Sequence, residues 1–128
     1  MSQMQRTNLL KSGCLLRAIH HSFQLTNLSE EEFFQKAIES GACDAECFVN
    51  HEAMCRLLKN LTGQDLRYRF SLTNPRNKKS HVFKCFSKNG LTHFVEVNSN
   101  DDVLFDTVYD SVLRRDYESC SYRCYDEF

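Results

Sequence analysis

The spacing of hydrophobic and polar residues changes near residue 63. Before that point, apolar residues recur every three or four positions, as Leu15, Ile19 and Phe23 do. This spacing is typical of an amphipathic helix. After that point, apolar and polar residues alternate, as in "DLRYRFSL" at 65–72. Alternation is typical of a half-buried strand. The chain is therefore expected to place helices first and strands afterwards.

Three helices are expected in the first half. The first begins at Gly13 or Cys14 and continues to about Phe23. The second begins after Ser29, because Ser29 and Glu32 have the spacing of a capping box.

Glycines mark where the later helices end. Gly41 follows the second helix, and Gly63 follows a third helix that begins near Asn50. Four strands come next, and Asn89-Gly90 is a strong turn signal between two of them. The strands are expected at 65–72, 81–87, 91–97 and 103–109.

This order of elements predicts an α+β fold, with N-terminal helices packed on a C-terminal antiparallel sheet. The length of 128 residues suits a single domain spanning 1–128. The segment "SCSYRCYDEF" at 119–128 has no clear assignment.

Composition narrows the classes of function. Hydrophobic residues make up 41% of the chain, too many for a disordered protein. The formal net charge of −1 argues against binding nucleic acid through bulk charge. No apolar run has the length of a membrane span or the form of a signal peptide. The expected location is the cytoplasm, where thiols stay reduced.

Cys14 stands out among the seven cysteines because it opens the first predicted helix in "SGCLLRAI". A helix N-terminus favours a thiolate, since the helix dipole and free N–H groups stabilise negative charge. A nucleophilic cysteine also needs a base. His20 and His21 are about two turns away along the same helix, too far for direct contact.

His93 and Asp106 are the better candidates for partners of Cys14. Each lies in the middle of a predicted strand, where a polar side chain needs either water or a partner. A hairpin turn within "NSNDD" would pair Asn98 with Val103 and put His93 opposite Val108. Asp106 would then be the diagonal neighbour of His93 on the same face. A one-residue slip in register would remove this match.

Together these residues would form a Cys-His-Asp triad. Cys14 would be the nucleophile, His93 would take its proton, and Asp106 would orient the imidazole. The Cys14 backbone N–H supplies one oxyanion donor, and a side-chain amide upstream could supply a second.

The sequence resembles the papain-like cysteine peptidase superfamily over roughly residues 5–110. The resemblance rests on "SGCLLRAI", "THFVEV" and "VLFDTV", and it is greatest to small bacterial and phage members related to bacteriocin-leader peptidases. It implies a papain-like hydrolase that cleaves a peptide or amide bond in a peptide or protein substrate, without a cofactor.

The resemblance also implies roles for particular residues. Cys14, His93 and Asp106 take the three triad positions. The family's oxyanion residue is usually a Gln a few positions before the cysteine. Asn8 has the usual spacing and Gln5 has the usual side chain. Where many relatives have Asp-Pro, this chain has Asp106 followed by Thr107.

Two alternatives belong to other classes. The first is a catalytically inactive papain-like scaffold that acts as a protein-binding or inhibitory module. The second is a zinc-stabilised domain, because four thiolates can hold a tetrahedral zinc. The possible zinc set is Cys43, Cys47, Cys120 and Cys124. If these four cysteines bind no metal, they are buried thiols without a chemical role.

Overall fold

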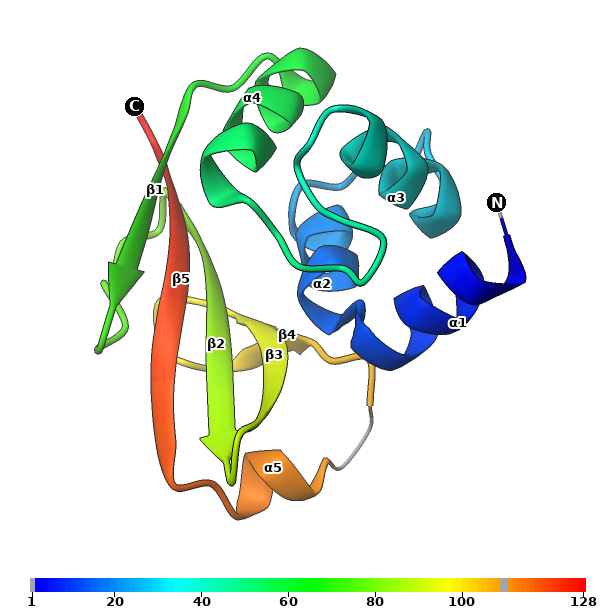
Figure 1. Cartoon of the computed structure of the whole chain (residues 1–128). Helices are drawn as coiled ribbons and strands as arrows, with labels where there is room; N and C mark the ends of the chain where they lie inside the picture. The colour runs from blue at the N-terminus through cyan, green and yellow to red at the C-terminus, as the bar shows by residue number, and fades with distance from the viewer. Residues whose placement is uncertain (1, 109–110) are drawn as a thin grey trace.

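The computed structural model describes residues 2–108 and 111–128 and has the expected α+β architecture (Figure 1). Four helices precede an antiparallel sheet, and a short fifth helix lies between the last two strands. The helices are α1 (Gln3–Ser12), α2 (Cys14–Ser22), α3 (Glu30–Glu39), α4 (His51–Thr62) and α5 (Val112–Arg115). The strands are β1 (Leu66–Ser71), β2 (Ser80–Lys88), β3 (Leu91–Val97), β4 (Val103–Phe105) and β5 (Ser119–Glu127).

The predicted helix boundaries are confirmed where a cap marks them. The Ser29 side chain accepts a hydrogen bond from the Glu32 N–H, and the Glu32 side chain accepts one from the Ser29 N–H. Asn50 caps α4 by accepting from the Ala53 N–H. Gly63 ends α4 in the left-handed conformation, which costs glycine little.

Helix α1 was not predicted, and it corrects the expectation that Cys14 begins the first helix. Cys14 begins the second helix, α2. Only Leu9 of α1 is buried, so the apolar spacing that marks a helix is missing there. The signal that was present is a second capping box, formed by Ser2 and Gln5.

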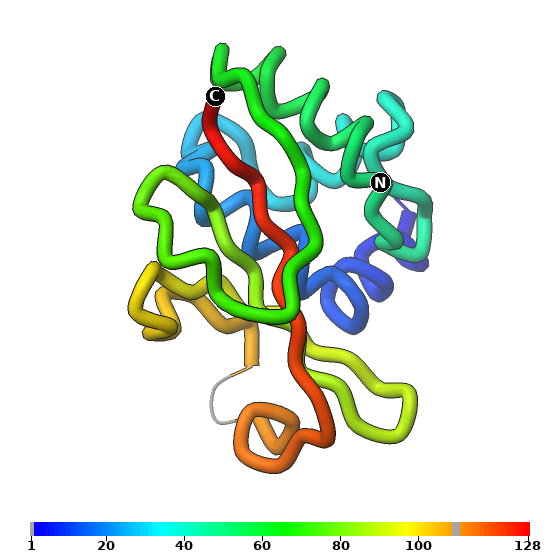
Figure 2. The backbone as a smooth tube through the Cα atoms, turned by 90° about the vertical axis from the view of Figure 1, so that its left-hand side faces the viewer, coloured from blue at the N-terminus to red at the C-terminus, as the bar shows by residue number. Residues whose placement is uncertain are grey.

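The unassigned segment at 119–128 contains β5, which lies inside the sheet. The strand order is β1-β5-β2-β3-β4, with every neighbouring pair antiparallel. Figure 2 shows β5, in red, running beside β1. Its pattern of alternate burial puts Tyr122 and Cys124 on one face and Tyr125 on the other.

Strand β4 is shorter than predicted, and a β-bulge divides its pairing with β3. Val103 pairs with Val97 instead of Asn98, whereas Phe105 pairs with Glu96, as the predicted hairpin implies. The strand ends at Phe105. Consequently Asp106 follows the strand, and His93 has no β4 residue opposite it among the described pairs. Tyr109, the last residue of the predicted strand, lies outside the described residues.

The sheet separates two groups of buried side chains. The larger group lies between α2, α3, α4 and the sheet, and it includes Phe33, Phe34 and Phe83. The smaller group covers the opposite face and is partly closed by Leu113 of α5. Because successive side chains of a strand point to opposite faces, Phe83 of β2 packs in the first group and Phe86 packs in the second.

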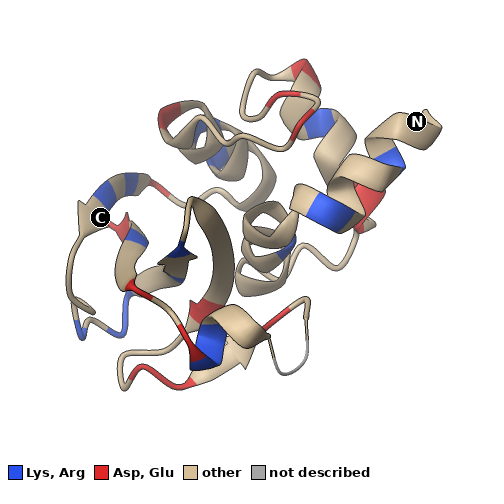
Figure 3. Cartoon of the chain, turned by 60° about the horizontal axis from the view of Figure 1, so that its bottom comes forward, with Lys and Arg blue, Asp and Glu red and all other residues tan. Residues whose placement is uncertain are grey.

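Acidic and basic residues are interspersed over the part of the molecule that Figure 3 shows. Among the described residues, no helix combines the length and the apolar character that crossing a bilayer requires.

Candidate active site

Cys14 lies at the junction of α1 and α2, where Gly13 both ends one helix and begins the next. The Gly13 N–H donates to the Leu9 carbonyl at 3.0 Å, and the Gly13 carbonyl accepts from the Arg17 N–H at 2.8 Å. A Cβ atom at position 13 would lie 2.3 Å from the Leu9 carbonyl oxygen. Glycine therefore allows the tight junction that places Cys14 in the first turn of α2.

The surroundings of the Cys14 thiol favour its ionised form. Its burial would raise its pKa, but several groups together outweigh that effect and lower the pKa below its ordinary value. These groups are a hydrogen bond with His93, the Phe94 N–H, the charge of His93 and the Leu15 N–H. The last is a free amide of the first turn of α2.

His93 changes in the complementary direction. Its hydrogen bond with Cys14 raises its pKa, burial lowers it, and the hydrogen bond and charge of Asp106 raise it further. The net result is a pKa above the ordinary value for histidine. A thiol that loses its proton easily beside an imidazole that holds one favours a thiolate–imidazolium pair.

Asp106 receives hydrogen bonds at both of its carboxylate oxygens. Oδ1 lies 2.7 Å from His93 Nε2 and accepts from the Val108 N–H at 2.9 Å. Oδ2 accepts from Arg114 Nη1 at 3.1 Å. The side chain of Asp106 is 7% exposed, so solvent screens these contacts little. With Nε2 directed to Asp106, Nδ1 of His93 is the ring nitrogen left for Cys14.

The structure thus brings Cys14, His93 and Asp106 together, although the predicted pairing is wrong at Val103 and does not extend to His93. The early end of β4 explains how this is possible. Pairing between β3 and β4 is limited to Glu96 and Val97. The Phe94 N–H is therefore free of β4 and contacts Cys14 instead. A longer β4, as predicted, would have occupied the edge of β3 that α2 reaches.

The two predicted oxyanion residues, Gln5 and Asn8, have different surroundings. The Gln5 side-chain oxygen accepts from the Ser2 N–H at 2.9 Å, as part of the cap at the far end of α1. Asn8 lies closer to Cys14 along α1, and its Nδ2 donates to the Ala45 carbonyl at 2.8 Å. An amide nitrogen carries two hydrogens, so Asn8 has a second one to donate.

The possible zinc set is not brought together. Cys43 and Cys47 lie in the loop between α3 and α4 and pack among the helices, whereas Cys120 and Cys124 pack on the other face of the sheet. Within 2–108 and 111–128, no three His, Cys, Asp or Glu residues are arranged to hold a metal ion. Burial, the largest cause in each case, raises the thiol pKa of Cys43 to about 12 and that of Cys47 to about 11.

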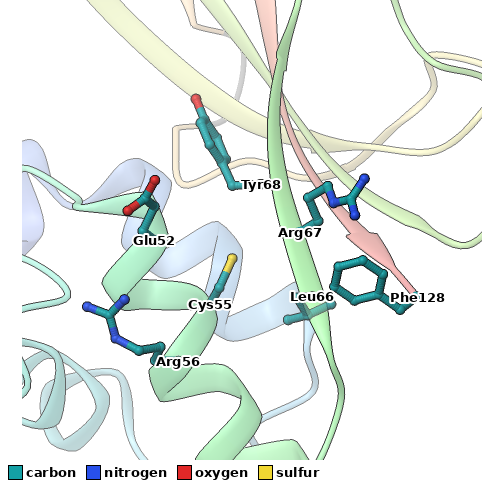
Figure 4. Close-up of a pocket in the computed structure, with 7 residues that line it drawn as sticks. All are labelled: Glu52, Cys55, Arg56, Leu66, Arg67, Tyr68 and Phe128. Carbon is teal, nitrogen blue, oxygen red and sulfur yellow. The ribbon is translucent and has the colours of Figure 1, made fainter.

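A cavity of about 380 Å³ lies elsewhere, between α4 and β1. Cys55 and Tyr68 line it together with Arg56 and Arg67. The two arginine side chains point away from each other (Figure 4), so they do not form one anion site. None of the triad residues lines this cavity.

Sequence reasoning missed three contributors to the site. Arg114 lies on the four-residue helix α5, which is too short to produce an apolar pattern. The N–H groups of Leu15 and Phe94 belong to the backbone, so the order of side chains does not reveal them.

Comparison of the chain with protein-family models, with curated proteins and with solved structures finds no match in any of the three.

Proposed function

We propose that this protein is a papain-like cysteine hydrolase that cleaves a peptide or amide bond with Cys14, His93 and Asp106. The observation that carries the proposal is the contact of a Cys14 thiol of lowered pKa with a His93 of raised pKa, which is in turn bound to Asp106. Perturbed ionisable groups in mutual contact are typical of functional sites.

In the proposed reaction, the Cys14 thiolate attacks the substrate carbonyl carbon and pushes the carbonyl electrons onto oxygen. The Cys14 backbone N–H and Asn8 Nδ2 are the proposed donors to that oxyanion. When the C–N bond breaks, the His93 imidazolium gives its proton to the leaving amine. A thioester then links the substrate acyl group to Cys14.

Water completes the proposed cycle. Neutral His93 takes one proton from a water molecule, whose oxygen attacks the thioester carbon. The C–S bond breaks, the carboxylic acid leaves, and Cys14 returns as a thiolate beside protonated His93. Asp106 keeps the imidazole oriented in both halves and stabilises its positive charge.

The first experiment follows alkylation of each cysteine by iodoacetamide between pH 4.5 and 9, mapped by mass spectrometry. We expect folded protein to be labelled first at Cys14, at least about tenfold faster at pH 6 than an ordinary thiol, because a thiolate is already present. His93→Ala should remove that advantage. Cys43 and Cys47 are internal controls, since burial raises their pKa.

An opposite result would favour a different class of function. If Cys14 of the folded protein reacts no faster than Cys43 or Cys47, or if His93→Ala leaves its profile unchanged, no thiolate–imidazolium pair exists. The protein would then be a non-catalytic binding or inhibitory module on this scaffold, to be identified through its protein partner.

A further inference from the structure

Asp106 has a partner that the triad itself does not require. Arg114 Nη1 donates to Oδ2 at 3.1 Å, while His93 uses only Oδ1. We propose that Arg114 is a positioning residue that holds the Asp106 carboxylate in the orientation that binds His93. This inference rests on the function proposed above.

The argument begins with the burial of the carboxylate. The side chain of Asp106 is 7% exposed, so water cannot readily replace a lost hydrogen bond. Without Arg114, Oδ2 would lie in a site with little access to water and would lose the hydrogen-bond donor that the described part of the chain provides for it. The carboxyl group could relieve that cost by turning its oxygens toward solvent. That change weakens its hold on the His93 imidazolium.

The contact between Arg114 and Asp106 is less exposed to solvent than an ordinary surface ion pair. Exposed pairs contribute little because solvent screens both charges. Here one partner is buried and the other, Arg114, is 33% exposed along its side chain. A charge-assisted hydrogen bond to a buried carboxylate fixes direction as well as charge.

Helix α5 is placed by groups other than Arg114. Leu113 packs against the buried side chains on the outer face of the sheet. Asp116, directly after the helix, forms an ion pair with Lys88 of β2. Arg114 therefore extends from an anchored element to Asp106, and its removal need not release the helix.

This position of α5 supplies a matched control. Lys88→Gln removes an ion pair that anchors the end of α5 without touching Asp106. Arg114→Gln removes the contact with Asp106 and leaves the Lys88 anchor in place. A general loosening of α5 would affect both variants, whereas a positioning role for Arg114 affects only the second.

The test measures the pH profile of Cys14 alkylation in the full chain for wild type, Arg114→Gln, Arg114→Lys, Lys88→Gln, Asp106→Asn and His93→Ala. We expect Arg114→Gln to slow alkylation at pH 6 by about threefold to tenfold, because the acid limb moves by half to one pH unit toward that of Asp106→Asn. Arg114→Lys should lie in between, since lysine keeps a charge but has no planar fork. Lys88→Gln should follow wild type.

The outcomes separate this inference from the proposed function. If Asp106→Asn moves the profile and Arg114→Gln does not, the inference is overturned and the triad stands. Equal shifts in Arg114→Gln and Lys88→Gln also overturn it, because α5 anchoring would explain both. If His93→Ala itself leaves the profile unchanged, the proposed function fails. Should Arg114→Gln not fold, Arg114→Lys decides, and a wild-type profile overturns the inference.

Discussion

Gly13 has room for a hydrogen atom and for nothing larger. Its carbonyl and N–H serve both helices at the junction, and the Leu9 carbonyl lies against the place where a side chain would begin. The position of Cys14 therefore depends on a neighbour with no reactive side chain.

Gly13→Ala should destabilise the protein by about 2–3 kcal/mol, since the new methyl group must displace backbone in a packed junction. Urea unfolding followed by circular dichroism measures the loss. Gly41→Ala is the matched control, because it has open space around it and only a left-handed φ of 75° to strain. That strain costs roughly 1–2 kcal/mol. Equal losses, with Cys14 alkylation unchanged, would contradict the steric argument.

At this scale the sequence predicted the three residues that the structure brings together, and it missed the groups that support them. Cys14 could be found because it opens an apolar helix, and His93 and Asp106 because polar residues interrupted apolar strands. Their contact was predicted through a register that is correct at Phe105 and wrong by one residue at Val103. It survives because imidazole and carboxylate reach one another after the strand has ended. Arg114 neither opens an apolar helix nor interrupts an apolar strand, so the sequence pattern does not single it out.

At the scale of elements, α1 links the site to the loop between α3 and α4. Asn8 makes that link through the Ala45 carbonyl. The same side chain is the proposed second oxyanion donor, so its two possible roles can be separated by choosing the reaction that is measured.

Asn8→Ala should leave the pH profile of iodoacetamide alkylation unchanged, because that reaction forms no oxyanion. Acylation by an activated ester such as p-nitrophenyl acetate should slow by about 10²- to 10³-fold, the usual effect of losing one oxyanion donor. Gln5→Ala is the control and should slow neither reaction, because its oxygen serves the cap of α1. Equal slowing of both reactions would instead point to loss of the Ala45 tether.

Elements with strong local signals were predicted well, and elements without them were not. Capping residues located α3 and α4, and Asn89-Gly90 located the turn between β2 and β3, where both residues have positive φ. The end of β4 was missed because a bulge and the approach of α2 decide it, and both are tertiary effects. The segment that forms β5 alternates too irregularly to be assigned without its neighbours.

At the scale of the molecule, a pair formed by a partly buried histidine and a buried tyrosine couples the helices to the sheet. His51 Nδ1 of α4 lies 2.7 Å from the Tyr125 hydroxyl of β5. The His51 ring also stacks on Tyr68 at 4.0 Å. Burial, with the charge of Arg123, lowers the pKa of His51 to about 4. The histidine is thus held neutral at the interface between the two halves.

This low pKa predicts a loss of stability in acid. Between the folded pKa of about 4 and an unfolded pKa near 6.5, the unfolded chain binds a proton that the folded chain does not. The free energy of unfolding should therefore fall as the pH drops from about 6.5 to about 4. His51→Gln should show a shallower fall over that window when urea unfolding is measured at each pH. At pH 7.5, where this histidine is neutral in both states, the difference between the two proteins reports the lost contacts alone. Parallel curves for the two proteins would contradict the assignment to His51.

The central position of β5 has a consequence for how the molecule assembles. Strands β2 and β3 meet through a two-residue turn and can pair early, but β1 and β2 are joined only by a strand that comes after all the others. Closing such a distant pairing is entropically costly and slow. A chain that stopped before Ser119 would still carry Cys14, His93, Asp106 and Arg114, yet it would lack the strand that joins the two parts of the sheet. We therefore expect completion of the sheet to be the late, non-local step of folding, and reactivity at Cys14 to report on it.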